Sequence, residues 1–551
     1  MGMHIDLDLL PLGVTNLTQF KNYGLVYIDK TDLVAKLARK IQPIFISRPR
    51  RFGKTTLLQT LEILFSKGKE PFKGLKLYDK WSDNRVYKVI HLDFSSSFWT
   101  TFDGFLSSLY SQIKQEFLNK DISIDGVTSE HPGDFFRDCL KKSSSENFVF
   151  LLDEYDDPLI VAKGISEELY ANMLKFYNDF FKTVKALAGN QFRFTLITGI
   201  LKLSQTSIFS GGNSFNDLSM SSDFGELLGI TDSELHTYFD EYIANLGKTN
   251  HLTKEQTYQL LKENYNGYCF DEECSTSVYN PWSILGCLQK PKRGFEPYWM
   301  DSGSPESLII SHYRNSKNKT ELEDRIKPIL DLNSKSGIIK SESELTSKSS
   351  FEDIDDVSLL YQAGFLTIKE LVGDKKFKID FPNQEVRSSI NRIILEKILS
   401  LDIDDNIASK NDVLHDLMSG DHNVVSRVLN NIVRLFSYNS KQLLLSKESM
   451  VVDMIYSVLV SKNIRVNREN LNLSGRSDLE VFSNDRCVVF EFKIAKSLDD
   501  IEVKKQEAFI QVKKHHYGET SNVNHTDKYA VIVVDEPNDG STNFLKVFKV
   551  E

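Results

Sequence analysis

Three charged residues near the C-terminus have the types and spacing for metal-dependent chemistry: Asp478, Glu491 and Lys493. They lie in two alternating runs joined at SNDR, residues 483–486, and such runs predict a β-hairpin. Side chains alternate across a strand, so Glu491 and Lys493 share one face. Two carboxylates can hold Mg²⁺ or Mn²⁺, and a lysine beside them can position or deprotonate a water that the metal polarises.

The length of the turn decides whether Asp478 joins that face. A loop of two residues (484–485) or four (483–486) places Asp478 directly opposite Glu491, with Cβ atoms about 5 Å apart. A three-residue loop turns Asp478 to the other face unless a bulge corrects the register. Opposed carboxylates repel each other without a cation between them. The alternative is a solvated hairpin face, but the apolar run CVVFEF (487–492) indicates a strand covered on both sides.

A second group of residues could bind a nucleotide. The segment ISRPRRFGKTTLL (46–58) follows a strand-like run and opens a helix. Gly53 lets the main chain approach a phosphate, at a helix N-terminus that favours anions. Lys54 can reach the β- and γ-phosphates of ATP, and the Thr55 hydroxyl can ligate Mg²⁺. Arg48 stands where the P-loop pattern G-x-x-x-x-G-K-[ST] has its first glycine, so an ordinary helix start is the alternative.

Carboxylates further along the chain would complete this nucleotide site. The run NFVFLLDEYDD predicts a buried strand that ends in Asp153 and Glu154. Asp153 can hold the magnesium shell and Glu154 can orient the attacking water, although an acidic loop after a strand is common. Thr198 is a candidate sensor of the γ-phosphate or, alternatively, an ordinary strand residue. The predicted nucleotide-binding residues are Arg48, Arg51, Gly53, Lys54, Thr55, Thr56, Asp153 and Thr198, with Glu154 catalytic and Thr55 and Asp153 as magnesium ligands.

The elements of residues 1–230 must position that site. Strand-like runs alternate with amphipathic helical stretches, which predicts an α/β domain with a parallel sheet covered on both faces. Residues 231–350 are expected to be helical and to end in a serine- and lysine-rich connector. Residues 351–440 show a helix–strand–strand–helix order compatible with a winged-helix-like module, and residues 441–551 contain the hairpin.

Composition narrows the class of protein. A chain of 551 residues with 40% hydrophobic residues predicts two to four packed domains. Five dispersed cysteines suit a reducing cytoplasm better than a disulfide framework. A net charge of −10 argues against non-specific coating of nucleic acid, although a local basic groove stays compatible with it. We find no signal peptide and no apolar run that approaches the roughly 20 residues needed to span a bilayer, so we expect no membrane association.

Several motifs recur in this order in one group of proteins: LPLGVTNLTQF, YIDKT, RPRRFGKT, DEYDDPL, SIFSGGNSFNDLS, YNGYCF, YNPWS and FPNQEVR. Over nearly its whole length, the chain therefore resembles bacterial AAA-ATPase-like proteins that end in a PD-(D/E)XK nuclease-superfamily domain. That family also carries arginine at the first P-loop glycine, as at Arg48. The chain is also similar to archaeal-type, STAND-related ATPases, in which a winged helix follows the nucleotide domain. The resemblance implies an α/β restriction-endonuclease-like domain over residues 441–551.

The resemblance implies further site residues. It places Tyr27, Asp29 and Lys30 near the nucleotide, and Gln511 on a helix that faces the catalytic strands, in a Q-x5-Y arrangement with Tyr517. Glu448 matches a glutamate on a preceding helix; an exposed helical glutamate is the alternative. Four lysines either line a phosphate-binding groove or form a solvated helix face: Lys504, Lys505, Lys513 and Lys514.

Together these patterns predict an ATP-binding and hydrolysing protein that controls a metal-dependent nuclease. Its catalytic residues would be Asp478, Glu491, Lys493 and Gln511, with Asp478 and Glu491 as metal ligands. By resemblance the substrate is nucleic acid, DNA more than RNA. The alternative is a nucleotide-dependent switch or scaffold that binds nucleic acid or protein through a non-cleaving nuclease fold. The sequence leaves open whether the protein forms a homo-oligomer.

Overall fold

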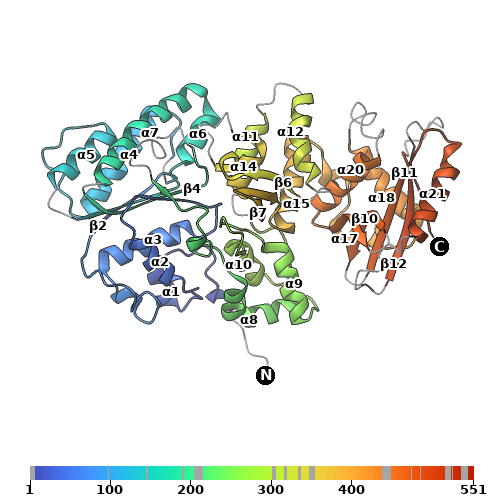
Figure 1. The fold of residues 1–551 in the computed structure, drawn as a ribbon, viewed down its shortest axis with the longest axis horizontal. Helices are drawn as coiled ribbons and strands as arrows, with labels where there is room; N and C mark the ends of the chain where they lie inside the picture. Colours follow the sequence, from blue (N-terminus) through green and yellow to red (C-terminus); the bar gives the residue numbers. More distant parts are fainter. Residues whose placement is uncertain are drawn as a thin grey trace. The chain divides into compact units, whose positions relative to one another are not determined.

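The computed structural model describes residues 6–96, 98–143, 147–188, 191–203, 215–300, 306–314, 319–332, 337–346, 354–436, 448–472, 475–483, 486–514, 523, 525–534 and 544–550. The chain forms two compact units (Figure 1). The first unit comprises residues 1–308 and 338–383, and the second comprises residues 309–337 and 384–551.

A parallel five-stranded sheet, ordered β2-β3-β4-β1-β5, forms the centre of the first unit. Its strands are β1 (Ile44–Ser47), β2 (Lys88–Asp93), β3 (Phe148–Asp153), β4 (Phe192–Gly199) and β5 (Asn216–Asp217). Every residue of β3 is buried, as expected for a strand covered on both faces. The four strands predicted from the sequence and the parallel pairing are confirmed.

Helices cover both faces of this sheet (Figure 1). On one face lie α1 (Leu17–Tyr23), α2 (Thr31–Ala38) and α3 (Lys54–Lys67); on the other lie α4 (Phe102–Asn119), α5 (Pro132–Lys142), α6 (Asp157–Ile165) and α7 (Glu167–Ala188). The strands lie between two helical layers, so they bury their aliphatic side chains on both sides. The sheet is therefore a rigid support for the loops at its carboxyl edge.

A helical group follows the sheet in the chain. It consists of α8 (Asp232–Thr249), α9 (Lys254–Tyr265) and α10 (Pro281–Gln289). Reciprocal capping boxes begin the first two helices, with Thr231 paired to Glu234 and Thr253 paired to Gln256. Phe239, Leu261 and other apolar side chains of these helices form one core cluster with Leu10 from the N-terminal segment. The helical group is therefore packed against the beginning of the chain.

The helix–strand–strand–helix order expected within residues 351–440 is present. It consists of α14 (Asp356–Ala363), β7 (Thr367–Gly373), β8 (Lys376–Asp380) and α15 (Gln384–Arg392). A third strand, β6 (Ile338–Ser341), pairs with β8, and α13 (Glu342–Thr346) follows it. Part of the passage expected to be a connector is therefore regular structure. The boundary between the two units falls after Asn383, inside the stretch that we expected to be one module.

The second unit contains a mixed sheet ordered β13-β12-β11-β10-β9. Its strands are β9 (Arg465–Asn472), β10 (Gly475–Ser483), β11 (Arg486–Ala495), β12 (His525–Val534) and β13 (Leu545–Lys549), and only the β11–β12 pair is parallel. Among the described residues, the α-helices that belong wholly to this unit are α12 (Lys319–Asp331), α15, α16 (Ile403–Asn406), α17 (Lys410–Leu417), α18 (His422–Arg434), α20 (Glu448–Ser461) and α21 (Asp500–Lys514). A π-helix (Ile393–Ile398) follows α15, and α11 (Glu306–Arg314) begins before the unit.

Two different helix layers cover this mixed sheet (Figure 1). Leu479, Phe490 and Phe492 share a large core with α18 and α20. On the other face, Cys487 and Val489 pack against Ala508 of α21. The predicted α/β architecture of both ends of the chain is confirmed. In the described ranges, we find no helix that combines the length and the apolar composition of a membrane span.

Candidate functional sites

The strand order brings three predicted nucleotide-site segments to one edge of the first sheet. Strand β4 lies between β1 and β3, with Ser47 paired to Gly199 and Leu152 paired to Ile197. The loop after β1, the end of β3 and the end of β4 are therefore neighbours. Ligands of open parallel sheets bind at the carboxyl ends of the strands.

Asp153 is the centre of a hydrogen-bond chain at this edge. The Thr55 hydroxyl donates to its Oδ2 over 2.7 Å, and the Thr198 hydroxyl donates to its Oδ1 over 2.6 Å. The main-chain N–H of Glu154 also donates to Oδ1, over 3.0 Å. Asp153 and Thr198 are buried. Three residues chosen from separate motifs thus lie in direct contact.

The P-loop lysine is buried beside the second predicted carboxylate. Lys54 is 3% exposed, and its Nζ donates to the main-chain carbonyls of Arg48 (3.0 Å) and Pro49 (3.2 Å). The same Nζ lies 3.3 Å from Oε1 of Glu154. Oε2 of Glu154 is buried without a hydrogen-bond partner. Lys54 and Glu154 therefore form an ion pair at the loop, and one carboxylate oxygen of that pair is still able to accept a hydrogen bond.

The loop geometry before Lys54 needs special main-chain conformations. Gly53 is the N-cap residue of α3 and has a φ of +97°, in the left-handed region. As a glycine it has no side chain that could cap the helix. Arg51 has φ +70°, and its guanidinium lies 4.3 Å from the ring centroid of Trp282. No side chain of Gly53 therefore caps the first turn of α3, and a helix N-terminus of this kind favours an anion such as a phosphate.

Arg48 differs from the other predicted nucleotide-site residues in its environment. Its guanidinium is buried, donates to the carbonyls of Ser219 (2.6 Å) and Phe224 (3.4 Å), and stacks on the ring of Phe270 at 4.4 Å. Burial lowers the pKa of Arg48 to about 10. The Arg48 side chain therefore connects the loop after β1 to residues 219 and 224. The contact with Lys54 is made by the main-chain carbonyl of Arg48.

Asp156 and Gly199 position the end of β4, and sequence reasoning missed both. The Asp156 carboxylate accepts the main-chain N–H groups of Ile200 (3.1 Å) and Leu201 (2.7 Å). Burial, followed by the charge of Glu154, raises the pKa of Asp156 to about 7. A Cβ atom on Gly199 would lie 2.5 Å from Oδ1 of Asp156, so only glycine allows this approach.

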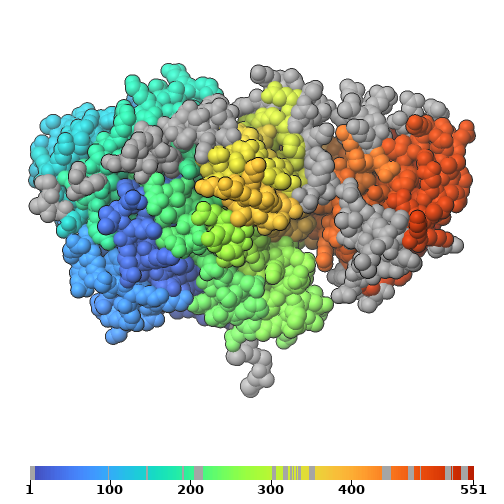
Figure 2. Space-filling view, viewed as in Figure 1, coloured from blue at the N-terminus to red at the C-terminus, as the bar shows by residue number. Residues whose placement is uncertain are grey.

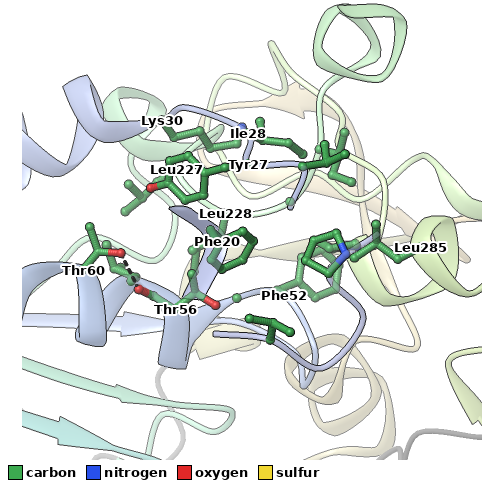
Figure 3. Close-up of a pocket in the computed structure, with 18 of the residues that line it drawn as sticks. Phe20, Tyr27, Ile28, Lys30, Phe52, Thr56, Thr60, Leu227, Leu228 and Leu285 are labelled. Atoms are coloured by element: carbon green, nitrogen blue, oxygen red, sulfur yellow. Dashed lines mark hydrogen bonds between the residues drawn. The ribbon is translucent and has the colours of Figure 1, made fainter. Parts of the chain in front are cut away.

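An apolar cavity of about 180 Å³ adjoins the P-loop at Gly53 and Thr56 (Figure 3). Three parts of the first unit contribute its walls: the N-terminal segment, the start of α3, and the region from 227 to 285. Thr60, on the α3 wall, donates its hydroxyl to the carbonyl of Thr56 over 2.7 Å. The apolar walls include Phe20, Tyr27, Ile28, Phe52, Leu57, Leu227, Leu228 and Leu285.

Two of the three residues that the resemblance placed near the nucleotide line this cavity. Tyr27 and Lys30 belong to its wall, and the Lys30 Nζ lies 2.7 Å from Oε2 of Glu234 in α8. The Asp29 carboxylate instead accepts the N–H and hydroxyl of Thr31 and the N–H of Lys76. Asp29 therefore orders the start of α2.

In the second unit, the hairpin register predicted from the sequence is confirmed. Ser483 pairs with Arg486, and the ladder continues to Leu479 opposite Phe490. Two residues separate the strands, and the same register places Asp478 opposite Glu491. Oδ2 of Asp478 accepts the main-chain N–H of Phe492 over 2.7 Å.

The environment of Glu491 is unfavourable for a charged carboxylate. It is fully buried, its Oε1 accepts a hydrogen bond from Lys493 over 2.7 Å, and its Oε2 has no hydrogen-bond partner. Burial and the charge of Asp478 raise the pKa of Glu491 to about 8. Two oxygen-donor side chains with an orphaned buried oxygen fit a hard divalent cation. The described residues hold no ready-made cluster of three or more acidic, histidine or cysteine side chains around a metal position.

Comparison with known proteins identifies a domain at each end of the chain. Residues 11–209 match the family described as Predicted AAA-ATPase, and residues 446–543 match the PD-(D/E)XK nuclease superfamily. The chain carries both of these domains. An Azotobacter chroococcum mcd 1 protein, "Uncharacterized protein in vnfD 5'region", is 26% identical over 504 residues, which cover 88% of this chain and 89% of that protein.

The AAA-ATPase-like match contains the whole Thr55, Asp153 and Thr198 chain of hydrogen bonds. The cavity beside it is built partly from Leu228 and Leu285, which lie beyond residue 209. No motif in the sequence marked these two residues. Their apolar side chains become recognisable as a wall only after the helical group has packed against the start of α3.

Two other predicted residues of the PD-(D/E)XK domain lie on α20 and α21. Oε1 of Glu448, at the start of α20, lies 3.7 Å from the Lys493 Nζ. Gln511 is half-buried on α21, which packs against the face that carries Cys487, Val489 and Glu491. Tyr517 lies outside the described residues.

The four lysines of α21 do not form one row. Lys504 lies close enough to Glu448 to lower its pKa, against the larger effect of burial, which raises it. Lys505 stacks on the ring of Phe548 at 4.8 Å, while Lys513 and Lys514 are exposed. Lys504 is therefore near Glu448, whose carboxylate also lies 3.7 Å from the Lys493 Nζ.

Proposed function

We propose that the protein binds and hydrolyses ATP in the first unit and that nucleotide turnover controls a metal-dependent nuclease in the second. The Asp153 carboxylate, held by Thr55 and Thr198 beside Lys54, is the observation that carries the ATPase part. The opposed Asp478 and Glu491 carboxylates beside Lys493 support the nuclease part.

In the ATP site, the phosphates occupy the N-terminus of α3 and the base occupies the apolar cavity. Thr55 and Asp153 hold Mg²⁺, which supplies charge neutralisation for the phosphates. Lys54 exchanges its contacts with two carbonyls and Glu154 for the β- and γ-phosphates. Once Lys54 has moved, Glu154 is able to orient the attacking water and accept its proton.

In the nuclease site, Asp478 and Glu491 hold Mg²⁺ or Mn²⁺, which supplies Lewis-acid polarisation of the phosphodiester and the attacking water. Burial lowers the pKa of Lys493, but the charges of Glu491, Glu448 and Asp478 outweigh it and raise the pKa. Lys493 is therefore an ammonium ion that positions the water and neutralises phosphate charge. Gln511 completes the site from α21.

The substrate that we propose is nucleic acid, and DNA before RNA. The membership of residues 446–543 in a nuclease superfamily supports this class of substrate. The net charge of −10 indicates that binding depends on a local contact, for which Lys493 and Lys504 are candidates. No base-reading motif is part of the proposal, so we expect little sequence preference.

A cleavage assay on single- and double-stranded DNA and RNA, with Mg²⁺ or Mn²⁺ and with or without ATP, tests this function. We expect metal-dependent cutting of DNA that Lys493→Met abolishes. Lys496→Met is the matched control, because Lys496 is an exposed lysine three residues further along the chain and should cut like the wild type. Binding of DNA without any cutting by the wild type would instead support a nucleotide-dependent switch with a non-cleaving nuclease fold.

A further inference from the structure

The outward face of α21 carries aliphatic side chains that the second unit does not bury. Val503 is 58% exposed and Ile510 is 65% exposed. They are seven residues apart, so they lie on one stripe of the helix, two turns from each other. The opposite face of the same helix buries Ala508 and Val512 against the sheet. Figure 2 shows the red-orange atoms of this part of the chain at the surface.

Charges of opposite sign lie at the two ends of this stripe. Asp499 and Asp500 stand at the N-terminal end, and Lys513 and Lys514 stand at the C-terminal end. Both lysines and Asp499 are exposed. Between the two aliphatic residues lie Gln506 and Glu507, and Lys504 neutralises the Glu507 carboxylate through an ion pair of 2.7 Å. The order is therefore acidic, aliphatic, polar with a neutralised carboxylate, aliphatic and basic.

When two copies of α21 run in opposite directions, the acidic end of each helix faces the basic end of the other. We propose that α21 pairs antiparallel with α21 of a second copy of this chain, so that the protein forms a two-fold symmetric homodimer. Val503 then packs against Ile510 of the second copy, and the reverse contact follows from symmetry. Each acidic end faces a basic end, and the two helix dipoles oppose each other favourably.

Other occupants fit this face less well. A parallel pairing would bring like charges together at both ends, which is unfavourable. Nucleic acid would meet two aliphatic side chains and an acidic end, which repels phosphate. A single helix pair buries less surface than the roughly 1,200 Å² of a stable interface, so we expect a weak dimer that forms only at high protein concentration. The pairing does not depend on the proposed enzymatic activities.

Sedimentation equilibrium of the full chain over a range of concentrations tests this pairing. We expect the wild type to move from the mass of one chain towards twice that mass as concentration rises. Ile510→Glu should remain monomeric, because it buries a charge against Val503 of the second copy. Ile41→Glu, at another exposed isoleucine (79%), is the matched control and should dimerise like the wild type.

Charge reversal tests whether the charged ends of the stripe stabilise the pairing. We propose two double variants: one carries Lys513→Glu and Lys514→Glu, and the other carries Asp499→Lys and Asp500→Lys. Each variant should be monomeric alone. An equimolar mixture of the two variants should form heterodimers, because each altered end then meets its complement. Mixing the two variants does not change the stability of α21 within either chain. Heterodimer formation in the mixture would therefore show that the single variants fail to dimerise because of repulsion between copies and not because α21 is unfolded. A monomeric wild type, an Ile510→Glu variant that dimerises normally, or a mixture that stays monomeric would overturn the proposal.

Discussion

Thr55 Oγ1 lies 2.7 Å from Oδ2 of Asp153, although 98 residues separate them along the chain. The contact joins the first turn of α3 to the end of β3 across the neighbouring end of β4. Thr198 occupies that intervening position and donates to the other oxygen of the same carboxylate. One buried carboxylate therefore links three segments of the nucleotide site, and each donor to it has a measurable role.

Thr198→Val removes one of these donors and keeps the shape of the side chain. We expect a loss of stability of about 1–3 kcal/mol, because a buried carboxylate oxygen loses a hydrogen bond. ATP turnover should fall more than ATP affinity, since the residue orients Asp153. Denaturant unfolding and steady-state kinetics measure the two effects. Thr195→Val, at a buried threonine three residues earlier on the same strand, should leave turnover unchanged.

Gly199→Ala tests the close contact between β4 and the Asp156 side chain. The added methyl group would lie 2.5 Å from Oδ1 of Asp156 and 2.6 Å from Cδ1 of Tyr155. We expect a loss of stability of about 1–3 kcal/mol from overpacking. Gly164→Ala, in α6, is the control, because its new Cβ would have no neighbour within 4 Å. Equal stability of the two variants would contradict this account of β4.

The buried Asp156 predicts a pH dependence of stability. Its pKa is about 7 in the folded protein and about 3.9 in an unfolded chain, so the folded state holds the proton more tightly. This contribution to stability is complete below about pH 4 and is lost as the pH rises through 7. Asp156→Asn keeps an oxygen acceptor without the charge, and it should flatten the loss of stability from pH 5 to pH 8.

The size of that effect has an upper bound. The two pKa values limit the contribution of Asp156 to about 4 kcal/mol. Urea unfolding of wild type and Asp156→Asn at several pH values gives the difference directly. If the two stability curves run parallel between pH 5 and pH 8, the carboxyl does not titrate as the structure indicates.

The cavity beside Gly53 predicts where the base of ATP lies. Leu228→Trp should fill part of the roughly 180 Å³ volume and weaken ATP binding by about 10-fold or more. Inorganic triphosphate does not need the base pocket, so its binding should change much less. Titrations of both ligands by calorimetry compare the two affinities. An equal loss for ATP and triphosphate would place the base elsewhere.

The positions of residues at strand ends could be predicted from sequence because parallel strands end at one edge. The two-residue separation of Ser483 and Arg486 likewise fixed the hairpin register. The surroundings of Arg48 could not be predicted, since two of its carbonyl partners, Ser219 and Phe224, lie more than 170 residues away along the chain. The cavity walls and the contact of Asp156 with Gly199 also arise only when distant segments pack together.

The rate of DNA cleavage with Mg²⁺, measured with and without ATP for wild type, Asp478→Asn and Lys54→Met, tests the central claim most directly. We expect ATP to change the wild-type rate and Asp478→Asn to slow cleavage by about 100-fold or more. Lys54→Met should keep the ATP-independent rate and lose the response to ATP. Cleavage by Asp478→Asn at the wild-type rate would contradict the assignment of the hairpin as the nuclease site.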